Sequence, residues 1–181
     1  MPAVTLTYQQ GWRESLEPGF NPGTVRVEQQ GDIIKVEAHL VDDDIVDPDV
    51  KLNDHAYTKG DVFELFIMAE GESHYHELHT TPGGVRLQLK FKVGEPLDVK
   101  KAARWDEFFT VTTERVSDGW KAYYSIPVAN ISDLKPTPTR WKIACGRYDY
   151  RSDGSRILSN TAPLTECNFH RHHEWPVFDL A

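Results

Sequence analysis

The chain has 181 residues, 39% of them apolar and 27% charged, which is typical of one globular domain and excludes a disordered chain. Its 20 Lys and Arg residues stand against 28 Asp and Glu residues, a formal net charge of −8, and without a basic run we expect no nucleic-acid partner. No apolar run approaches the roughly 18 to 20 residues that span a bilayer, and residues 1–10 lack the basic and apolar regions of a signal peptide, so we expect neither feature.

Short apolar runs separated by turn-forming residues follow one another along the chain. We predict strands at residues 25–27, 33–41, 62–68, 75–79, 85–93, 108–116, 120–126, 141–148 and 177–180. Several runs alternate with the two-residue period of a strand; Phe63, Leu65 and Ile67, for example, share one face. Only residues 128–134 fit a short helix or helical turn. The pattern indicates an all-β sandwich or barrel, in a single domain over residues 1–181.

Polar side chains on two of these strands form the first candidate site. Glu64 lies on the face opposite Phe63, Leu65 and Ile67, and Glu77 shares one face of the next strand with His79. We expect Asp61, Glu64 and Glu77 to face one polar surface that bonds sugar hydroxyls; the alternative is a solvated face. A metal site on the second strand is disfavoured because His74 and His76 alternate away from His79.

Two further segments are rich in potential ligands. Asp42, Asp43 and Asp44 form an acidic loop that is either a solvated turn or a Ca²⁺ site, since Ca²⁺ takes several oxygen ligands from flexible loops. The spacing does not match an EF-hand. Residues 168–176 are rich in His and aromatic side chains, and we favour a loop that closes one end of the sandwich over a metal-binding tract.

The two cysteines, Cys145 and Cys167, are predicted as separate thiols, with a single bridge as the alternative. The chain has no nucleophile elbow, P-loop, dinucleotide fingerprint or His-Glu-x-x-His motif, so we expect no catalysis. A glycosidase pair of Glu64 and Glu77 is the enzymatic alternative.

The sequence from about residue 32 onward resembles the family 9 carbohydrate-binding modules and their DOMON-like relatives. The resemblance rests on Gly60-Asp61-Val62-Phe63-Glu64, then Tyr75-His76-Glu77 with Pro82-Gly83-Gly84, and on Gly119-Trp120 with the later Ile126-Pro127. It continues through a strand that contains Arg147 and a closing Phe169-His170 segment. The family implies a sandwich of two antiparallel sheets, of the jelly-roll or immunoglobulin-like kind.

The resemblance also implies a non-catalytic role in holding a glycan, often with structural Ca²⁺, in a secreted or cell-envelope setting. Family members grip the sugar between two aromatic rings, while carboxylates and an Arg bond its hydroxyls. By position, the resemblance assigns this role to Tyr57, Asp61, Glu64, Glu77, His79, Arg147 and Trp175. A glycoside hydrolase on another chain is the candidate partner.

Three alternatives to a carbohydrate-binding module stay open at this point. A DOMON-like domain would bind haem, with Met68 and His170 or His172 as ligands. A small glycan-acting hydrolase would use Glu64 and Glu77. A plain interaction sandwich would hold no small ligand.

Overall fold

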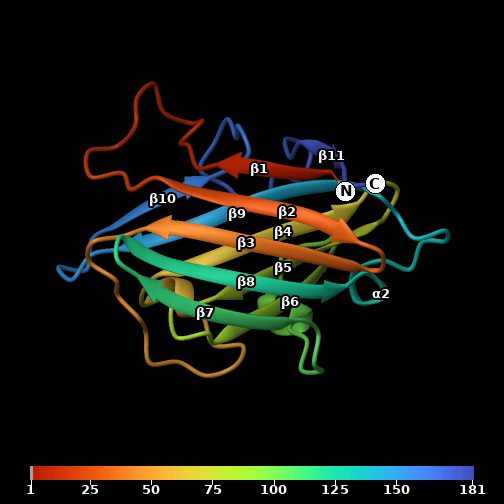
Figure 1. The fold of residues 1–181 in the computed structure, drawn as a ribbon, viewed down its shortest axis with the longest axis horizontal. Helices are drawn as coiled ribbons and strands as arrows, with labels where there is room; N and C mark the ends of the chain where they lie inside the picture. The colour runs from red at the N-terminus through yellow and green to blue at the C-terminus, as the bar shows by residue number, and fades with distance from the viewer. Residues whose placement is uncertain (1) are drawn as a thin grey trace.

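Residues 2–181, which the computed structural model describes, form a sandwich of two antiparallel β-sheets (Figure 1). The first sheet has five strands in the order β1 (Ala3–Thr7), β2 (Gly23–Gln30), β3 (Ile33–Val41), β8 (Gly119–Pro127) and β7 (Thr110–Val116). The second has six: β10 (Arg156–Asn160), β9 (Arg140–Tyr150), β4 (Val62–Ala69), β5 (His74–Thr80), β6 (Arg86–Lys92), and β11 (Val177–Asp179), which also pairs with β9. The predicted all-β antiparallel sandwich is confirmed.

Helical structure in the described residues is limited to single turns. These are α1 (Val99–Ala102), α2 (Val128–Ile131) and the 3₁₀ turn η1 (Ala56–Thr58). The turn expected within residues 128–134 is present as α2, whereas β1 and β10 form where no strand was predicted. No helix among residues 2–181 is long and apolar enough to cross a membrane. Cys145 is buried and Cys167 is exposed, and the two are not bridged.

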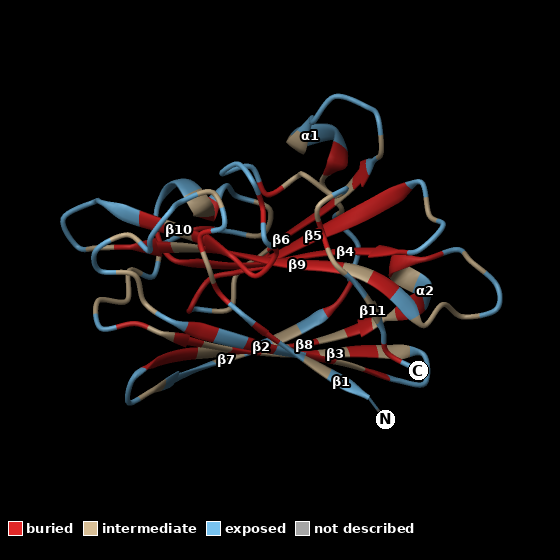
Figure 2. Cartoon of the chain, turned by 90° about the horizontal axis from the view of Figure 1, so that it is seen from above, coloured by how far each residue is buried: buried red, intermediate tan, exposed pale blue. Residues whose placement is uncertain are grey.

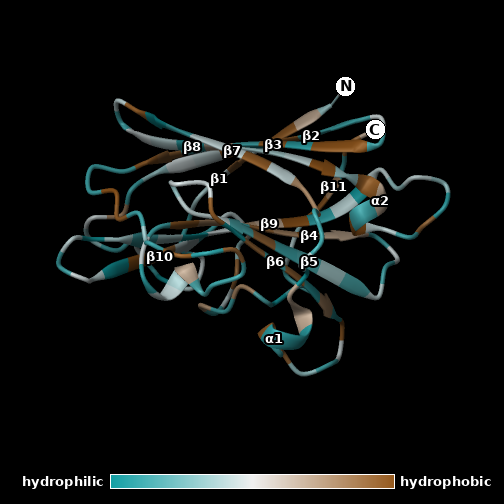
Figure 3. Cartoon of the chain, turned by 90° about the horizontal axis from the view of Figure 1, so that it is seen from below, coloured by the Kyte–Doolittle hydropathy of each residue, from teal (hydrophilic) through white to brown (hydrophobic). Residues whose placement is uncertain are grey.

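The five-stranded sheet follows the alternation of its sequence. Along β3 every second residue is buried, so that Ile34, Val36, Ala38 and Leu40 meet the other sheet, and the residues between them turn outward. The two sheets are separate layers in Figure 3, and the side chains between them form the larger hydrophobic core. This face-to-face burial of apolar area is the main source of stability in the fold.

The six-stranded sheet is buried on both faces. Every residue of β4 and β5 is buried, and so are most residues of β9 (Figure 2). Its outer face carries a second apolar cluster built on Phe66, Tyr75, Leu89 and Phe169. Loops and α1 cover this face on the side away from the first sheet (Figure 2). Polar residues that alternation turns outward from this sheet are therefore withdrawn from water.

A buried ionic cluster joins the two sheets at one end of the sandwich. Arg147, 1% exposed, donates to the carbonyl oxygens of Val41, at 2.7 Å, and Pro22, at 3.3 Å. Its guanidinium also pairs with Asp42 at 3.3 Å and Asp149 at 3.5 Å. Arg147 therefore connects β9 with the strand end and loop of the opposite sheet.

Replacing Arg147 by Met is expected to lower the free energy of unfolding by about 3 to 5 kcal/mol, because buried Asp42 would lose its cationic partner and Asp149 would keep only Arg151. The measurement is urea denaturation. Arg140→Gln is the control. Arg140 forms an exposed ion pair with Glu70, so its replacement should leave the free energy of unfolding unchanged within error. Equal losses in the two variants would contradict a structural role for Arg147.

Candidate functional site

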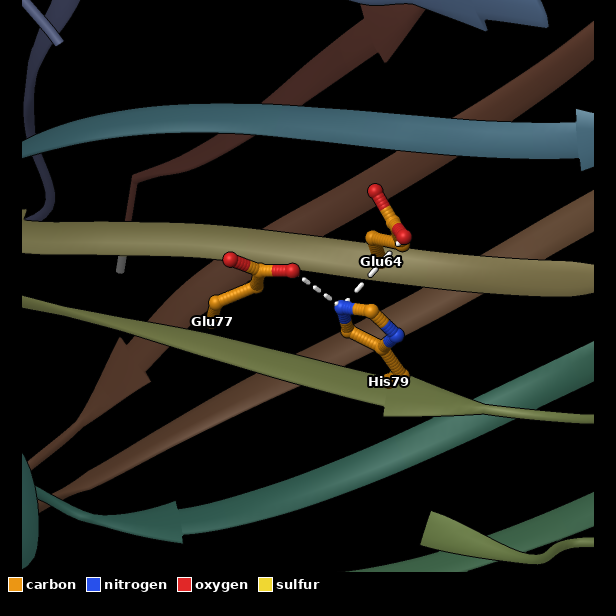
Figure 4. A group of neighbouring side chains, drawn as sticks. All are labelled: Glu64, Glu77 and His79. Atoms are coloured by element: carbon orange, nitrogen blue, oxygen red, sulfur yellow. Dashed lines mark hydrogen bonds and ion pairs between the residues drawn. The ribbon is translucent and has the colours of Figure 1, made fainter. Parts of the chain in front are cut away.

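The side chains of Glu64, Glu77 and His79 converge on the outer face of the six-stranded sheet (Figure 4). In the register between β4 and β5, Glu64 lies directly opposite His79. Glu77 shares the outer face of β5 with His79, because the two are alternate residues of one strand. Nε2 of His79 lies 2.5 Å from a carboxylate oxygen of Glu77 and 3.3 Å from one of Glu64. One imidazole nitrogen thus contacts two carboxylates, which we call the Glu-His-Glu group.

The Glu-His-Glu group is almost completely removed from water. Glu64 is 2% exposed, Glu77 is 5% and His79 is 1%. Burial raises the pKa of Glu64, and the negative charge of Glu77 raises it further against the opposing effect of His79. Burial by itself would lower the pKa of His79, but the two carboxylates and the hydrogen bond that His79 donates to Glu77 raise it overall. The group therefore retains protons that exposed carboxylates would release.

A glycine on β9 leaves the space that Glu64 occupies. Gly146 pairs directly with Glu64 across the sheet. A Cβ atom at position 146 would lie 2.7 Å from Oε2 of Glu64 and 2.7 Å from the ring of Phe169. The absence of a side chain at Gly146 thus allows the carboxylate and the Phe169 ring to pack over the same strand.

The group lies beside a pocket of about 240 Å³ that opens to solvent. Two carboxylates and four aromatic rings line the pocket, together with apolar and polar residues from the covering loops. The lining consists of Tyr57, Glu64, Phe66, Glu77, Leu89, Val99, Tyr148, Leu158, Cys167, Asn168, Phe169 and His170. This combination of buried acceptors and aromatic walls is typical of a site for a small polar ligand.

One carboxylate oxygen in the pocket wall has no protein partner. Oε2 of Glu77 is buried and accepts no hydrogen bond. Nε2 of His170 lies 3.6 Å away, which is beyond hydrogen-bond distance. Nδ1 of His170 is held 2.8 Å from the hydroxyl of Tyr75. Because unsatisfied buried acceptors are costly, Oε2 of Glu77 marks a position for a donor from outside the chain.

The structure brings together four of the residues named from the sequence. Tyr57, Glu64 and Glu77 line the pocket, and His79 bonds both carboxylates. The ring of Tyr57 lies edge-on to His79, with centroids 5.8 Å apart. The expectation that Glu64 and Glu77 share a face is therefore met.

Asp61 and Arg147 do not belong to this surface, and the expectation that they do is wrong. Asp61 is 1% exposed and accepts backbone N–H groups of Val46 and Tyr150 at 2.6 and 2.7 Å. Arg147 pairs with Phe63 in the register of β9 and β4, so that it lies on the inner face, opposite Glu64. Both residues stabilise the end of the sandwich instead.

The expected aromatic clamp is also wrong at one of its two positions. Trp175 is 3% exposed, and its indole N–H donates to the carbonyl of Phe169 at 3.0 Å. Its ring packs against Phe66 and Tyr75, with centroids 5.4 and 5.2 Å away, and it does not line the pocket. Trp175 supports the loop that carries Phe169, and Tyr57 alone keeps the position expected for a clamp.

The acidic loop does not form the arrangement expected of a calcium site. Asp42 points inward and pairs with Arg147, Asp43 pairs with Arg151, and Asp44 accepts the backbone N–H of Ser152. The inward carboxylate of Asp42 clusters with Asp61 and Asp149, but the guanidinium of Arg147 already supplies positive charge there. Calcium binding at this loop stays a prediction that these contacts do not favour.

The ligands named for haem are not gathered at the pocket. His170 lines it, whereas Met68 packs in the second apolar cluster and His172 lies against Tyr75 and Trp175. Residues 168–176 form a loop, as expected, but the loop packs over the outer face of the six-stranded sheet through Phe169 and Trp175 instead of closing one end of the sandwich.

Tyr148 and Phe169 are two of the pocket residues that the sequence analysis did not assign to the site. Tyr148 lies on β9, where the alternation that turns Trp141, Ile143 and Cys145 inward places it outward. That two-residue period could have identified Tyr148 and excluded Arg147. Phe169 lies in a loop, where no periodic signal exists.

Searches of known proteins found matches only among solved structures. No protein-family model and no curated protein matches the chain. A candidate carbohydrate-binding protein from Bacteroides uniformis superposes with a TM-score of 0.76 at 14% identity, covering 98% of this chain and 85% of that one.

A family 9 carbohydrate-binding module from Caldicellulosiruptor kristjanssonii, solved with glucose and with cellotriose, matches with a TM-score of 0.62 in both structures, at 12% identity. The matches cover 95% of this chain and 79% and 77% of those chains. At these identities the likeness shows a shared fold: this chain has the β-sandwich fold found in carbohydrate-binding modules.

Replacing Trp175 by Ala is expected to cost about 3 to 5 kcal/mol of stability, because a buried ring that packs against Phe66 and Tyr75 would be lost. Thermal and urea unfolding measure the effect. Trp105→Ala provides a matched control, since Trp105 is 70% exposed. A Trp175→Ala protein as stable as the wild type would return Trp175 to the list of candidate ligand contacts.

Proposed function

We propose that this protein is a non-catalytic carbohydrate-binding module that holds one sugar unit in the pocket beside the Glu-His-Glu group. Tyr57, Tyr148 and Phe169 supply rings for the apolar face of the sugar, and Glu64 and Glu77 accept hydrogen bonds from its hydroxyls. The observation that carries the proposal is the buried, unpartnered Oε2 atom of Glu77 in the pocket wall.

The chemistry of the pocket favours a neutral, hydroxyl-rich ligand. A pyranose has apolar C–H faces and an edge of hydroxyl groups, which matches rings on the walls and carboxylates at the base. The pocket, of about 240 Å³, is smaller than the roughly 300 to 1,000 Å³ of sites for drug-sized molecules, so it suits a single ring. The fold is shared with a module solved in complex with glucose and with cellotriose, which makes β-linked glucose the first ligand to test.

The arrangement of the carboxylates supports binding over hydrolysis. Glycosidases place two carboxyl groups on either side of the bond that breaks. Here Glu64 and Glu77 come from neighbouring strands of one sheet face and contact the same imidazole nitrogen. In a binding role the module would serve a glycoside hydrolase on another chain, a partner that we propose from the family resemblance alone.

A glycan array followed by calorimetric titration with glucose and cellotriose tests the proposal. Glu77→Gln is expected to weaken the affinity roughly 10- to 100-fold, because a hydrogen bond to a charged acceptor contributes about 1.5 to 3 kcal/mol. Glu114→Gln is the control, since Glu114 lies on the five-stranded sheet. No binding to any glycan, or unchanged affinity in a folded Glu77→Gln protein, contradicts the proposal, as does sugar release by the pure protein.

A further inference from the structure

We propose that Glu64, Glu77 and His79 form a binding site for a divalent transition-metal ion of the Zn²⁺ class, with His170 as a fourth ligand. This inference does not depend on carbohydrate binding. It follows from four side chains that meet at the base of the pocket and from the atoms that they leave without partners.

The ligand atoms already lie within the span of one metal ion. One imidazole nitrogen and one oxygen from each glutamate all fall within 4.8 Å of one another. Metal–nitrogen and metal–oxygen bonds to Zn²⁺ are about 2.0 to 2.2 Å, so two ligand atoms of one ion are at most about 4 Å apart. Shifts of about one ångström in the ligand atoms would therefore place all three at bonding distance from one metal ion. Figure 4 shows the three side chains pointing toward one another from β4 and β5.

His170 is oriented as metal-binding histidines are. Such a histidine commonly donates its second ring N–H to another protein group, which fixes the ring and leaves the first nitrogen free to bind the metal. Nδ1 of His170 lies 2.8 Å from the hydroxyl of Tyr75, and Nε2 faces Oε2 of Glu77 at 3.6 Å. That oxygen is buried and has no hydrogen-bond partner. A free imidazole nitrogen and a free carboxylate oxygen thus face each other across a gap too long for a hydrogen bond.

The charges and donor types select the kind of ion. Metal binding would release the protons that the group retains, because ligands bind in their deprotonated forms. Two carboxylates and two neutral imidazoles then carry a charge of −2, which a divalent cation cancels. A mixed set of nitrogen and oxygen donors suits Zn²⁺ and its first-row neighbours, whereas Ca²⁺ requires six to eight oxygen ligands. With all four side chains bound, a tetrahedral Zn²⁺ site is closed, whereas three protein ligands leave the fourth position for a water molecule or a ligand hydroxyl.

The test uses chelator-treated, full-length protein titrated with Zn²⁺ by calorimetry, and with Co²⁺ by visible absorption. We expect one ion per chain, with a dissociation constant of about 1 µM or tighter, and a Co²⁺ spectrum that reports bound nitrogen and oxygen ligands. His79→Gln should weaken Zn²⁺ binding at least about 100-fold. His39→Gln is the matched control, because His39 lies 3.0 Å from the carboxylate of Asp118 on the surface of the other sheet.

If His79→Gln does not fold, Tyr75→Phe is the second test variant. Tyr75→Phe removes only the hydroxyl that orients His170, and it should weaken Zn²⁺ binding roughly 10-fold or more. The inference is overturned if no Zn²⁺ binds one-to-one, or if binding survives both variants. It is also overturned if His172→Gln and His173→Gln abolish binding, because the ion would then occupy the exposed part of the closing loop. No sugar is present in these titrations, so their failure leaves the carbohydrate proposal intact.

Discussion

The contact of one imidazole with two carboxylates, on a sheet face sealed from solvent, is the feature on which the site depends. Burying three ionisable groups costs free energy that mutual attraction only partly offsets. An apolar trio at Glu64, Glu77 and His79 would pack against the second apolar cluster without that cost. Because stability does not favour three polar groups at this place, we propose that they are there to bind a ligand.

The same constraint accounts for the architecture around the site. The outer face of the six-stranded sheet is covered, so the loops carrying Tyr57 and Phe169 must cross it and must leave room for the carboxylates. Gly146 provides that room on β9. The indole N–H of Trp175 donates to the carbonyl oxygen of Phe169 and so fixes the loop that carries Phe169. The pocket is the remaining space between this loop cover and the sheet. Its polar base comes from strands, and its aromatic wall is shared: Phe66 and Tyr148 lie on strands, whereas Tyr57 and Phe169 lie on the covering segments.

Sequence alternation predicted the part of the site that lies on strands. It turned Glu64, Glu77 and His79 outward, and β4 and β5 pair so that the three converge. The same rule, applied strictly, would have placed Asp61 and Arg147 on the inner face, where the structure has them. Arg147 was assigned to the site from the family resemblance, and Asp61 was grouped with Glu64 although alternation places it on the same face as Phe63.

The positions of the loop residues could not be predicted from sequence alternation, because they depend on tertiary packing. Trp175 looked exposed among His and Glu neighbours, yet its ring is buried against Phe66 and Tyr75. His170 was named from the sequence as a possible haem ligand. Its orientation depends on Tyr75, which is 95 residues away in the sequence. Short-range pattern carries no information about contacts of that range.

A crystal structure of the protein soaked with glucose or cellotriose tests the central claim most directly. We predict a sugar ring in the pocket, with one of its hydroxyls within hydrogen-bond distance of Oε2 of Glu77 and its apolar face against a ring of the pocket wall. A sugar bound to the outer face of the five-stranded sheet, with the pocket beside Glu77 unoccupied, would contradict the claim.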